Sequence, residues 1–306
     1  IIITNLAGKV LPHNEYEISW DASAAERGGF EHFMLKEIFE QPKAIADTLL
    51  GRISGLGSDV TKGIDLKDID KVVIVACGTA YHAGLVGKYA IEKWANIAVD
   101  VELASEYRYR DPNVDKKTLL IPISQSGETM DTLMAMRYAK EKGAKVFSVC
   151  NTNGSTIPRE SDAVLYTNAG PEIAVASTKA FETQLIAMYL MGLHLGRIRG
   201  TISASLMAEI EGELAELPAK VEQVLETVEP LRELTKKFSK STSVLFLGRH
   251  VGYPTALEGA LKLKELAYMH AEGFAGGELK HGPIALIESG TPVVAIMPAA
   301  GSLLAE

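Results

Sequence analysis

The chain has 306 residues, of which 47% are hydrophobic and 23% are charged, a composition typical of a globular protein with about two domains. The formal net charge of −8 argues against a broad surface for nucleic acid or membrane lipid, although it allows a local anion pocket. No apolar run reaches the roughly 18 residues that a membrane span needs, and the N-terminus lacks the pattern of a secretory signal. We therefore expect a cytoplasmic protein.

The first half of the chain alternates between two kinds of apolar pattern. Residues 1–20 suggest the β-rich end of a preceding domain, and helical spacing interrupted by Pro42 follows. Uninterrupted apolar runs then alternate with helical segments, and such runs are typical of parallel strands covered on both faces. The predicted strands are 71–78, 98–105, 118–127, 145–151 and 163–170, with helices at 80–95 and 128–142. This alternation predicts an α/β fold with a doubly wound sheet.

The second half repeats the beginning of this pattern. After predicted helices at 177–198, 203–226 and 229–239, a strand at 243–250 turns at Gly248, as the strand at 71–78 turns at Gly78. In each copy the strand and helix are followed by a Glu, at Glu106 and at Glu278, with a basic residue two positions after it. We therefore predict two flavodoxin-like modules about 170 residues apart, the second incomplete at the C-terminus.

A short polar motif ends the strand at 118–127. Its sequence is SQSGET, in which Gly127 permits a tight turn and a helix follows at once. A helix N-terminus at the carboxyl end of a parallel strand attracts an anion, commonly a phosphate. Ser124, Gln125, Ser126 and Thr129 add neutral donors. The alternative is that Ser126 is only a helix cap.

Two further junctions between strand and helix carry hydroxyl groups, which supports a phosphorylated ligand. Thr79 follows the first strand, and Ser177 and Thr178 are the first residues of the predicted helix at 177–198. Neither GxGxxG after a strand nor GxxxxGK[ST] is present, so a dinucleotide or a nucleoside triphosphate is disfavoured.

The two cysteines, Cys77 and Cys150, each end an apolar run. We interpret both as small buried side chains rather than as a disulfide or a catalytic pair. Paired-cysteine and HExxH spacings are absent, so neither a metal nor another cofactor is expected.

A polar stripe marks the helical segment 256–268. Glu258, Lys262 and Glu265 share one face, while apolar residues cover most of the rest. One interpretation is a solvated stripe with an ion pair across one helical turn. The other is that the stripe faces a pocket, where Glu265 transfers a proton and His281, in a glycine- and proline-bounded loop, assists as an acid or base. A loop histidine is also common on a plain surface.

Five motifs, in order, closely resemble the sugar-isomerase half of the glucosamine-6-phosphate synthases, the glutamine–fructose-6-phosphate aminotransferases. They are CGTAYHAG (77–84), SQSGETMDTL (124–133), EIAVASTKAFETQ (172–184), ALEGALKLKE (256–265) and GELKHGPIALI (277–287). The resemblance covers almost the whole chain and implies two sugar-isomerase (SIS) modules. It also implies a reaction, in which fructose 6-phosphate receives ammonia from glutamine and isomerises to glucosamine 6-phosphate.

The resemblance assigns roles to residues of this chain. Ser124, Gln125, Ser126 and Thr129 would hold the phosphate. The sugar site would be lined by Cys77, Gly78, Thr79, Val175 and Ser177. Glu265 would move a proton between C1 and C2 beside Lys262, and His281 would assist ring opening from the partner subunit of a homodimer. Ala80 stands where some relatives carry serine.

The resemblance also implies a domain organisation. Residues 1–35 would be the end of a glutaminase domain and a linker, 36–200 the first SIS module, 201–240 connecting helices and 241–306 an incomplete second module. The family's N-terminal cysteine has no counterpart, so this chain is not expected to hydrolyse glutamine. The family's C-terminal tail, whose lysine forms a Schiff base with the sugar, has no counterpart either, so the chain is expected to bind phosphosugar but to catalyse little. The alternatives are a phosphosugar-binding regulator without catalysis and a simple ketose–aldose isomerase.

Overall fold

The computed structural model describes residues 2–12 and 26–297 and confirms the predicted α/β class. A five-stranded sheet has the order β2-β1-β3-β4-β5, and all of its neighbouring strands are parallel. Its strands are β1 (Lys71–Ala76), β2 (Ala98–Leu103), β3 (Thr118–Ser124), β4 (Lys145–Cys150) and β5 (Ala163–Tyr166). This is the strand order of flavodoxin-like folds.

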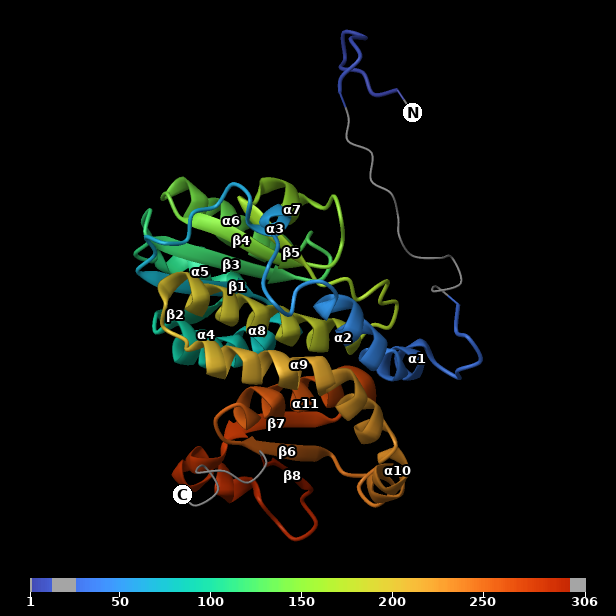
Figure 1. Ribbon diagram of the computed structural model, residues 1–306. Coiled ribbons are helices and arrows are strands. Elements are labelled where there is room, and N and C mark those ends of the chain that lie inside the picture. Colours follow the sequence, from blue (N-terminus) through green and yellow to red (C-terminus); the bar gives the residue numbers. More distant parts are fainter. Residues whose placement is uncertain (1, 13–25, 298–306) are drawn as a thin grey trace.

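Helices cover both faces of this sheet (Figure 1). One face carries α4 (Thr79–Ala95) and α8 (Lys179–Arg199). The opposite face carries α5 (Ala104–Tyr107), α6 (Met130–Glu141) and α7 (Thr156–Glu160). Before the sheet come α1 (Phe33–Phe39), α2 (Gln41–Leu49) and α3 (Ser58–Thr61), and the 3₁₀ helix η2 (Arg108–Arg110) follows α5. Pro42 lies in the first turn of α2, where a proline is tolerated.

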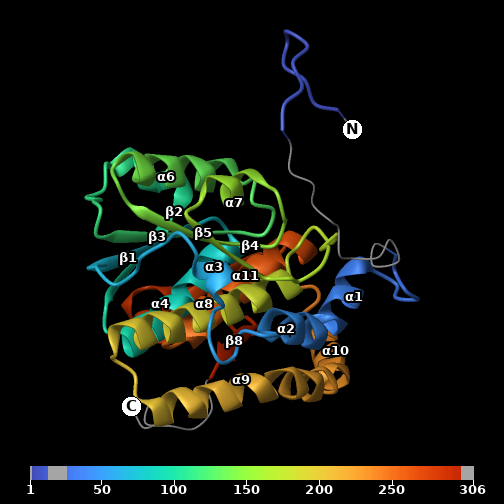
Figure 2. The same ribbon diagram turned by 45° about the horizontal axis from the view of Figure 1, so that its top comes forward.

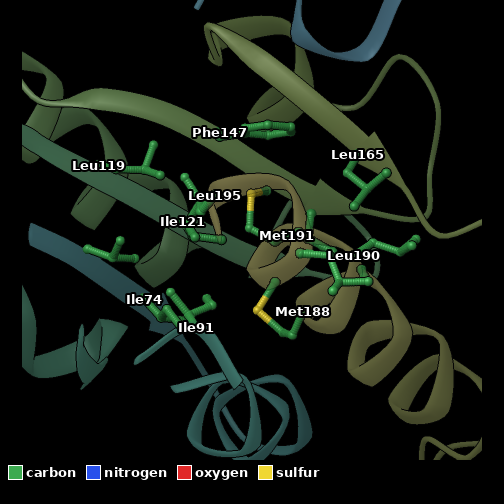
Figure 3. Close-up of a cluster of buried hydrophobic side chains, with 14 of the residues drawn as sticks. Ile74, Ile91, Leu119, Ile121, Phe147, Leu165, Met188, Leu190, Met191 and Leu195 are labelled. Carbon is green, nitrogen blue, oxygen red and sulfur yellow. The ribbon is translucent and has the colours of Figure 1, made fainter. Parts of the chain in front are cut away.

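The strands lack polar alternation because both of their faces are buried. All seven residues of β3 are buried, and its successive side chains alternate between the two cores. Leu119 and Ile121 face α4 and α8, whereas Leu120 faces the side of α6. Figure 3 shows the first core, in which Leu119, Ile121 and Phe147 of the sheet lie across from Met191 and Leu195 of α8.

Small residues bring α4 and α8 into close contact. Gly192 and Gly196 of α8 both lie against Trp94 of α4. A Cβ atom added at Gly196 would lie 2.8 Å from the backbone oxygen of Trp94. Because a backbone oxygen at a helix–helix contact cannot move aside easily, this contact admits only glycine.

The second module repeats the topology of the first. Its strands are β6 (Ser243–Gly248), β7 (His270–Ala275) and β8 (Val293–Ile296), in the parallel order β7-β6-β8. This order corresponds to β2-β1-β3, which confirms the predicted repeat. The helix α11 (Gly252–Ala267) follows β6 as α4 follows β1. Two 3₁₀ helices, η3 (Gly276–His281) and η4 (Pro283–Leu286), connect β7 to β8.

The two modules are in contact, and α11 packs against α4 (Figure 1). The connecting helices α9 (Ala204–Leu225) and α10 (Val228–Lys236) lead from one module to the other, and α9 runs along α2 (Figure 2). The apolar arc predicted for 256–268 is covered only in part. Ala260 is buried, but Leu266 is 45% exposed and Tyr268, just after the helix, is 90% exposed.

Parts of two predicted regions lie outside the described residues, namely residues 1 and 13–25 of the N-terminal region 1–35 and residues 298–306 of the second module. In the described part of the N-terminal segment, Thr4 pairs with Val10 in an antiparallel bridge. Within residues 2–12 and 26–297, every helix is too short or too polar to cross a bilayer.

The contact between α4 and α8 makes a prediction about stability. Gly196→Ala is expected to lower the free energy of unfolding by about 1–3 kcal/mol, because the added methyl group overpacks the contact with Trp94. The matched control is Gly212→Ala in α9, where nothing lies within 4 Å of the added atom. That change should stabilise the chain by about 0.5–1 kcal/mol through helix propensity. Urea denaturation measures both, and equal effects of the two substitutions would contradict the account.

Candidate functional site

A pocket of about 250 Å³ lies where β1 and β3 end. These strands are neighbours, but the chain leaves β1 into α4 on one face of the sheet and leaves β3 into α6 on the other. Ligands of open α/β sheets bind at this kind of switch point. The pocket is lined by Cys77, Thr79, Ala80, Ile123, Ser124, Gln125, Ser126, Thr129, Glu172, Ala174, Val175, Ser177 and Gln184.

Eight of the nine predicted binding residues therefore line one pocket, although they come from three separate junctions. The ninth, Gly78, is not among the lining residues but directly precedes α4, where its φ of 55° suits glycine. Glu172 and Gln184 also line the pocket; they begin and end the motif EIAVASTKAFETQ, but the sequence assigned neither of them a role.

The SQSGET turn (Ser124–Thr129) is held by its own hydroxyl groups. Ser124 Oγ accepts a bond from Gly127 N–H at 3.0 Å and lies 2.9 Å from Thr129 Oγ1. Ser126 Oγ accepts from Glu128 N–H at 3.2 Å. Gly127 has a φ of 66°, and an added Cβ atom would collide with the side chain of Ser155. The motif therefore needs both its hydroxyls and its glycine.

The helix after this turn begins two residues later than predicted. It starts at Met130 rather than Glu128, and Thr129, not Ser126, occupies the N-cap position. The interpretation of Ser126 as the helix cap is therefore wrong. The first backbone hydrogen bond of α6 runs from Leu133 N–H to Thr129 C=O. The N–H groups before Leu133 have no carbonyl partner within the helix, so they remain available to a ligand at the end of α6 that meets the turn.

The third wall of the pocket is the loop 170–178, which we call the pocket loop. Glu172 accepts bonds from Thr178 N–H at 2.8 Å, Ala180 N–H at 3.2 Å and Ser177 Oγ at 3.0 Å. This carboxylate thus stabilises the start of α8 and orients the Ser177 hydroxyl. Val175 is 96% exposed.

Both cysteines are free, as predicted. Burial raises the pKa of the Cys150 thiol to about 12. Cys77 is only half-buried and lines the pocket, with its Sγ 3.9 Å from Thr132 Oγ1. Burial also raises the pKa of Cys77, so its thiol is poorly suited to act as a nucleophile.

The polar stripe of α11 faces the first module rather than solvent. Glu258 is only 6% exposed, and its carboxylate accepts a bond from Thr79 Oγ1 at 2.9 Å. The other carboxylate oxygen lies 2.7 Å from His82 Nδ1 of α4. The interpretation of a solvated stripe is therefore wrong, and sequence alone offered no signal for His82.

The stripe reaches the pocket through Thr79. Lys262 Nζ donates to Thr79 Oγ1 at 3.1 Å and pairs with Glu258 at 3.3 Å. Glu265, whose side chain is 34% exposed, pairs with Lys262 at 2.7 Å. Lys262 thus contacts the pocket-lining hydroxyl of Thr79 directly, whereas Glu265 is linked to it only through Lys262. His281 is exposed in η3, and no described contact joins it to Lys262 or Glu265.

Two carboxyl groups near this interface, the buried Glu258 and the partly buried Glu182, differ in their pKa. Burial acts to raise the pKa of Glu258, but the bond with His82, the charge of Lys262 and the bond from Thr79 outweigh it, so the pKa is lowered. Burial and the negative charge of Glu258 raise the pKa of Glu182 to about 7. Glu258 is therefore an anion at neutral pH, whereas Glu182 is partly protonated.

The described residues hold no group of three or more His, Cys, Asp or Glu side chains arranged to bind a metal ion. The site's polar groups are hydroxyls, amides, backbone N–H groups, the carboxylate of Glu172 and the stripe of α11. This donor set is chemically suited to a phosphorylated polyol.

Comparison with known proteins agrees with this architecture. The SIS domain family matches residues 65–193 and 237–302. The glutamine–fructose-6-phosphate aminotransferase (isomerising) of Streptomyces coelicolor is 61% identical over 302 residues, covering 97% of this chain and 49% of that protein. The corresponding protein of Corynebacterium diphtheriae is 58% identical, with 97% and 48% covered. The chain thus spans about half the length of the curated relatives it matches.

A solved structure matches over most of both chains. It is the C-terminal domain of the glucosamine–fructose-6-phosphate aminotransferase of Francisella tularensis, with a TM-score of 0.85 and 42% identity, covering 92% of this chain and 79% of that one. The fold and the site thus define a SIS domain protein. More narrowly, the chain belongs to the family of the C-terminal, isomerising domains of the glutamine–fructose-6-phosphate aminotransferases.

The raised pKa of Glu182 predicts how stability depends on pH. In the unfolded chain this carboxyl titrates near its usual value of 4.5, so between about pH 4.5 and pH 7 the folded state binds more protons and stability falls as pH rises. Glu182→Gln should therefore raise the melting temperature at pH 8, by roughly 2–4 °C for each kcal/mol recovered, with little effect at pH 4.5.

The control for this measurement is Glu209→Gln at an exposed position of α9. It should shift the melting temperature by no more than about 1 °C at either pH. If Glu182→Gln lowered stability at pH 8, the carboxyl group would be ionised and stabilised there, contrary to the account.

Proposed function

We propose that the pocket binds fructose 6-phosphate and that this domain carries out the isomerising half of glucosamine 6-phosphate synthesis. The supporting observation is that eight predicted binding residues from three separate junctions line one pocket at the ends of β1 and β3. The relatives, whose names include fructose-6-phosphate aminotransferase, supply the substrate class.

The phosphate would lie in the SQSGET turn. Among the described residues, no Lys or Arg lines the pocket, so the phosphate would be held by hydroxyl groups, the Gln125 amide and the N-terminus of α6. Neutral donors and a helix dipole hold an anion without a fixed countercharge. Lys262, which contacts Thr79 but is not among the lining residues, would stay paired with Glu258 and Glu265.

The sugar would extend from the phosphate toward Thr79, Val175 and Ser177. At that end, Glu265 would remove a proton from C1 and return it to C2, converting the ketose form to the aldose form. Lys262, paired with Glu265 at 2.7 Å, would hold this carboxylate near the Thr79 wall and stabilise its charge. Glu258 holds Lys262 in place through the ion pair at 3.3 Å.

In the full-length protein this domain would work with a glutaminase domain that supplies ammonia from glutamine, in amino sugar biosynthesis in the cytoplasm. Residues 1–35 would be the end of that domain and the linker, 36–200 the first SIS module, 201–240 the connection and 241–306 part of the second. His281 is exposed in η3, apart from Lys262 and Glu265. It would reach the site of the other subunit in a homodimer and assist ring opening there.

The phosphate site predicts a difference between two sugars. The chain should bind fructose 6-phosphate in calorimetric titration and should not measurably bind unphosphorylated fructose. Ser126→Ala should weaken the binding of fructose 6-phosphate about tenfold, because one hydroxyl donor to a charged group is lost.

The matched control is Ser161→Ala, directly after α7, which removes a hydroxyl that donates to Ile157 C=O. Its affinity for fructose 6-phosphate should stay within about twofold of the original chain. Equal binding of both sugars, or a loss caused equally by the two substitutions, would contradict the phosphate site.

A further inference from the structure

Ala176 is the single buried apolar side chain of the pocket loop, all of whose residues the structure describes. The loop contributes Glu172, Ala174, Val175 and Ser177 to the pocket. Its larger apolar side chains point away from the core, since Ile173 is 44% exposed and Val175 is 96% exposed. A loop of this kind is positioned by its polar contacts rather than by hydrophobic burial.

One carboxylate from a distant part of the chain makes those contacts in the middle of the loop. Glu37 Oε1 accepts bonds from Ile173 N–H at 2.7 Å and from Ala174 N–H at 3.1 Å. Glu37 belongs to α1 and is only 2% exposed. The two amides it holds lie between Glu172, which orients Ser177, and Val175.

The helix that carries Glu37 is itself fixed to the start of α8. Glu40, which follows α1, pairs with Lys179 at 2.7 Å and with Lys36 at 3.4 Å. Lys179 is the first residue of α8 and is 4% exposed. These ion pairs therefore fix the position of α1, from which the Glu37 carboxylate contacts the wall of the pocket.

The burial of the Glu37 carboxylate makes the free energy of folding less favourable. Burial raises the pKa of Glu37, while the bonds from Ile173 and Ala174 act to lower it. Its second oxygen, Oε2, is buried and has no hydrogen-bond partner among the described residues. A buried acidic side chain with one unsatisfied oxygen contributes little net stability, so a structural role alone explains it poorly.

We propose that Glu37 is a positioning residue for the sugar end of the pocket, an inference that rests on the proposed function. By holding the two central amides of the pocket loop, it sets where Val175 and Ser177 meet the sugar. It does not touch the substrate itself. The phosphate end, formed by the SQSGET turn, does not depend on it.

The test compares two substitutions of similar size. Glu37→Gln keeps a carbonyl oxygen that can accept both amide bonds, whereas Glu37→Met has a similar length and no such acceptor. Calorimetric titration of the 306-residue chain with fructose 6-phosphate should show about tenfold weaker binding for Glu37→Met and a change within about twofold for Glu37→Gln.

A control separates positioning from general destabilisation. Ile45→Ala creates a cavity in the core under α2, where Ile45 is fully buried, and should lower the melting temperature at least as much as Glu37→Met. Its affinity for fructose 6-phosphate should nevertheless stay within about twofold. The proposal is overturned if Glu37→Met binds as the original chain does, or if Ile45→Ala weakens binding equally.

Amide hydrogen exchange gives a readout that does not require sugar binding. Protection of Ile173 and Ala174 should be lost in Glu37→Met and retained in Glu37→Gln. If the original chain did not bind fructose 6-phosphate at all, the proposed function would fail, and unchanged exchange at these two amides in Glu37→Met would separately refute the role of Glu37.

Discussion

Two neighbouring strands of a parallel sheet, β1 and β3, send the chain to opposite faces, and the site depends on this constraint. Because the following helices α4 and α6 diverge, the ends of the two strands are left uncovered, and the loops after them form two walls of a pocket. The third wall, the pocket loop, comes from the junction before α8, which packs beside α4 on the same face. A strand order without this reversal would have closed the gap with adjacent helices.

The contact between the modules adds charged groups next to a pocket whose lining offers neutral donors and the Glu172 carboxylate. The N-terminal turn of α4 is shared, because Thr79 lines the pocket and also bonds to Glu258 of α11. Glu258 is buried, so its charge has to be compensated, and His82, Thr79 and Lys262 compensate it. The same bonds place Lys262 against Thr79, one contact behind the pocket lining. A single buried carboxylate thus joins the packing of the modules to the proposed chemistry.

Much of the fold follows from local sequence. The strands β1, β3 and β4 were predicted because long apolar runs without alternation require cover on both faces, and the repeat was visible because Gly78 and Gly248 end equivalent strands. The position of the pocket followed from the rule for parallel sheets, together with hydroxyl groups at three junctions. The start of α6 was misplaced by two residues because the hydroxyls of Ser124 and Ser126 bond within the turn and delay the helix.

Contacts between residues far apart in the chain could not be predicted in this way. Glu258 bonds to Thr79 and His82 across 179 and 176 positions, and Glu37 reaches Ile173 across 136. No periodicity or motif links such pairs, because they meet only after the modules and α1 have packed. The same limit explains why the stripe of α11 could be read as solvated: its helical spacing is identical whether it faces water or another helix.

The most direct test of the account is a crystal structure of this chain with fructose 6-phosphate. The account predicts that the phosphate lies in the SQSGET turn, within hydrogen-bond distance of Ser126 Oγ and of backbone N–H groups at the start of α6. It also predicts that C1 and C2 of the sugar point toward Thr79 and the Lys262–Glu265 pair. A phosphate bound elsewhere, or a sugar bound with its phosphate at the Thr79 wall, would contradict it.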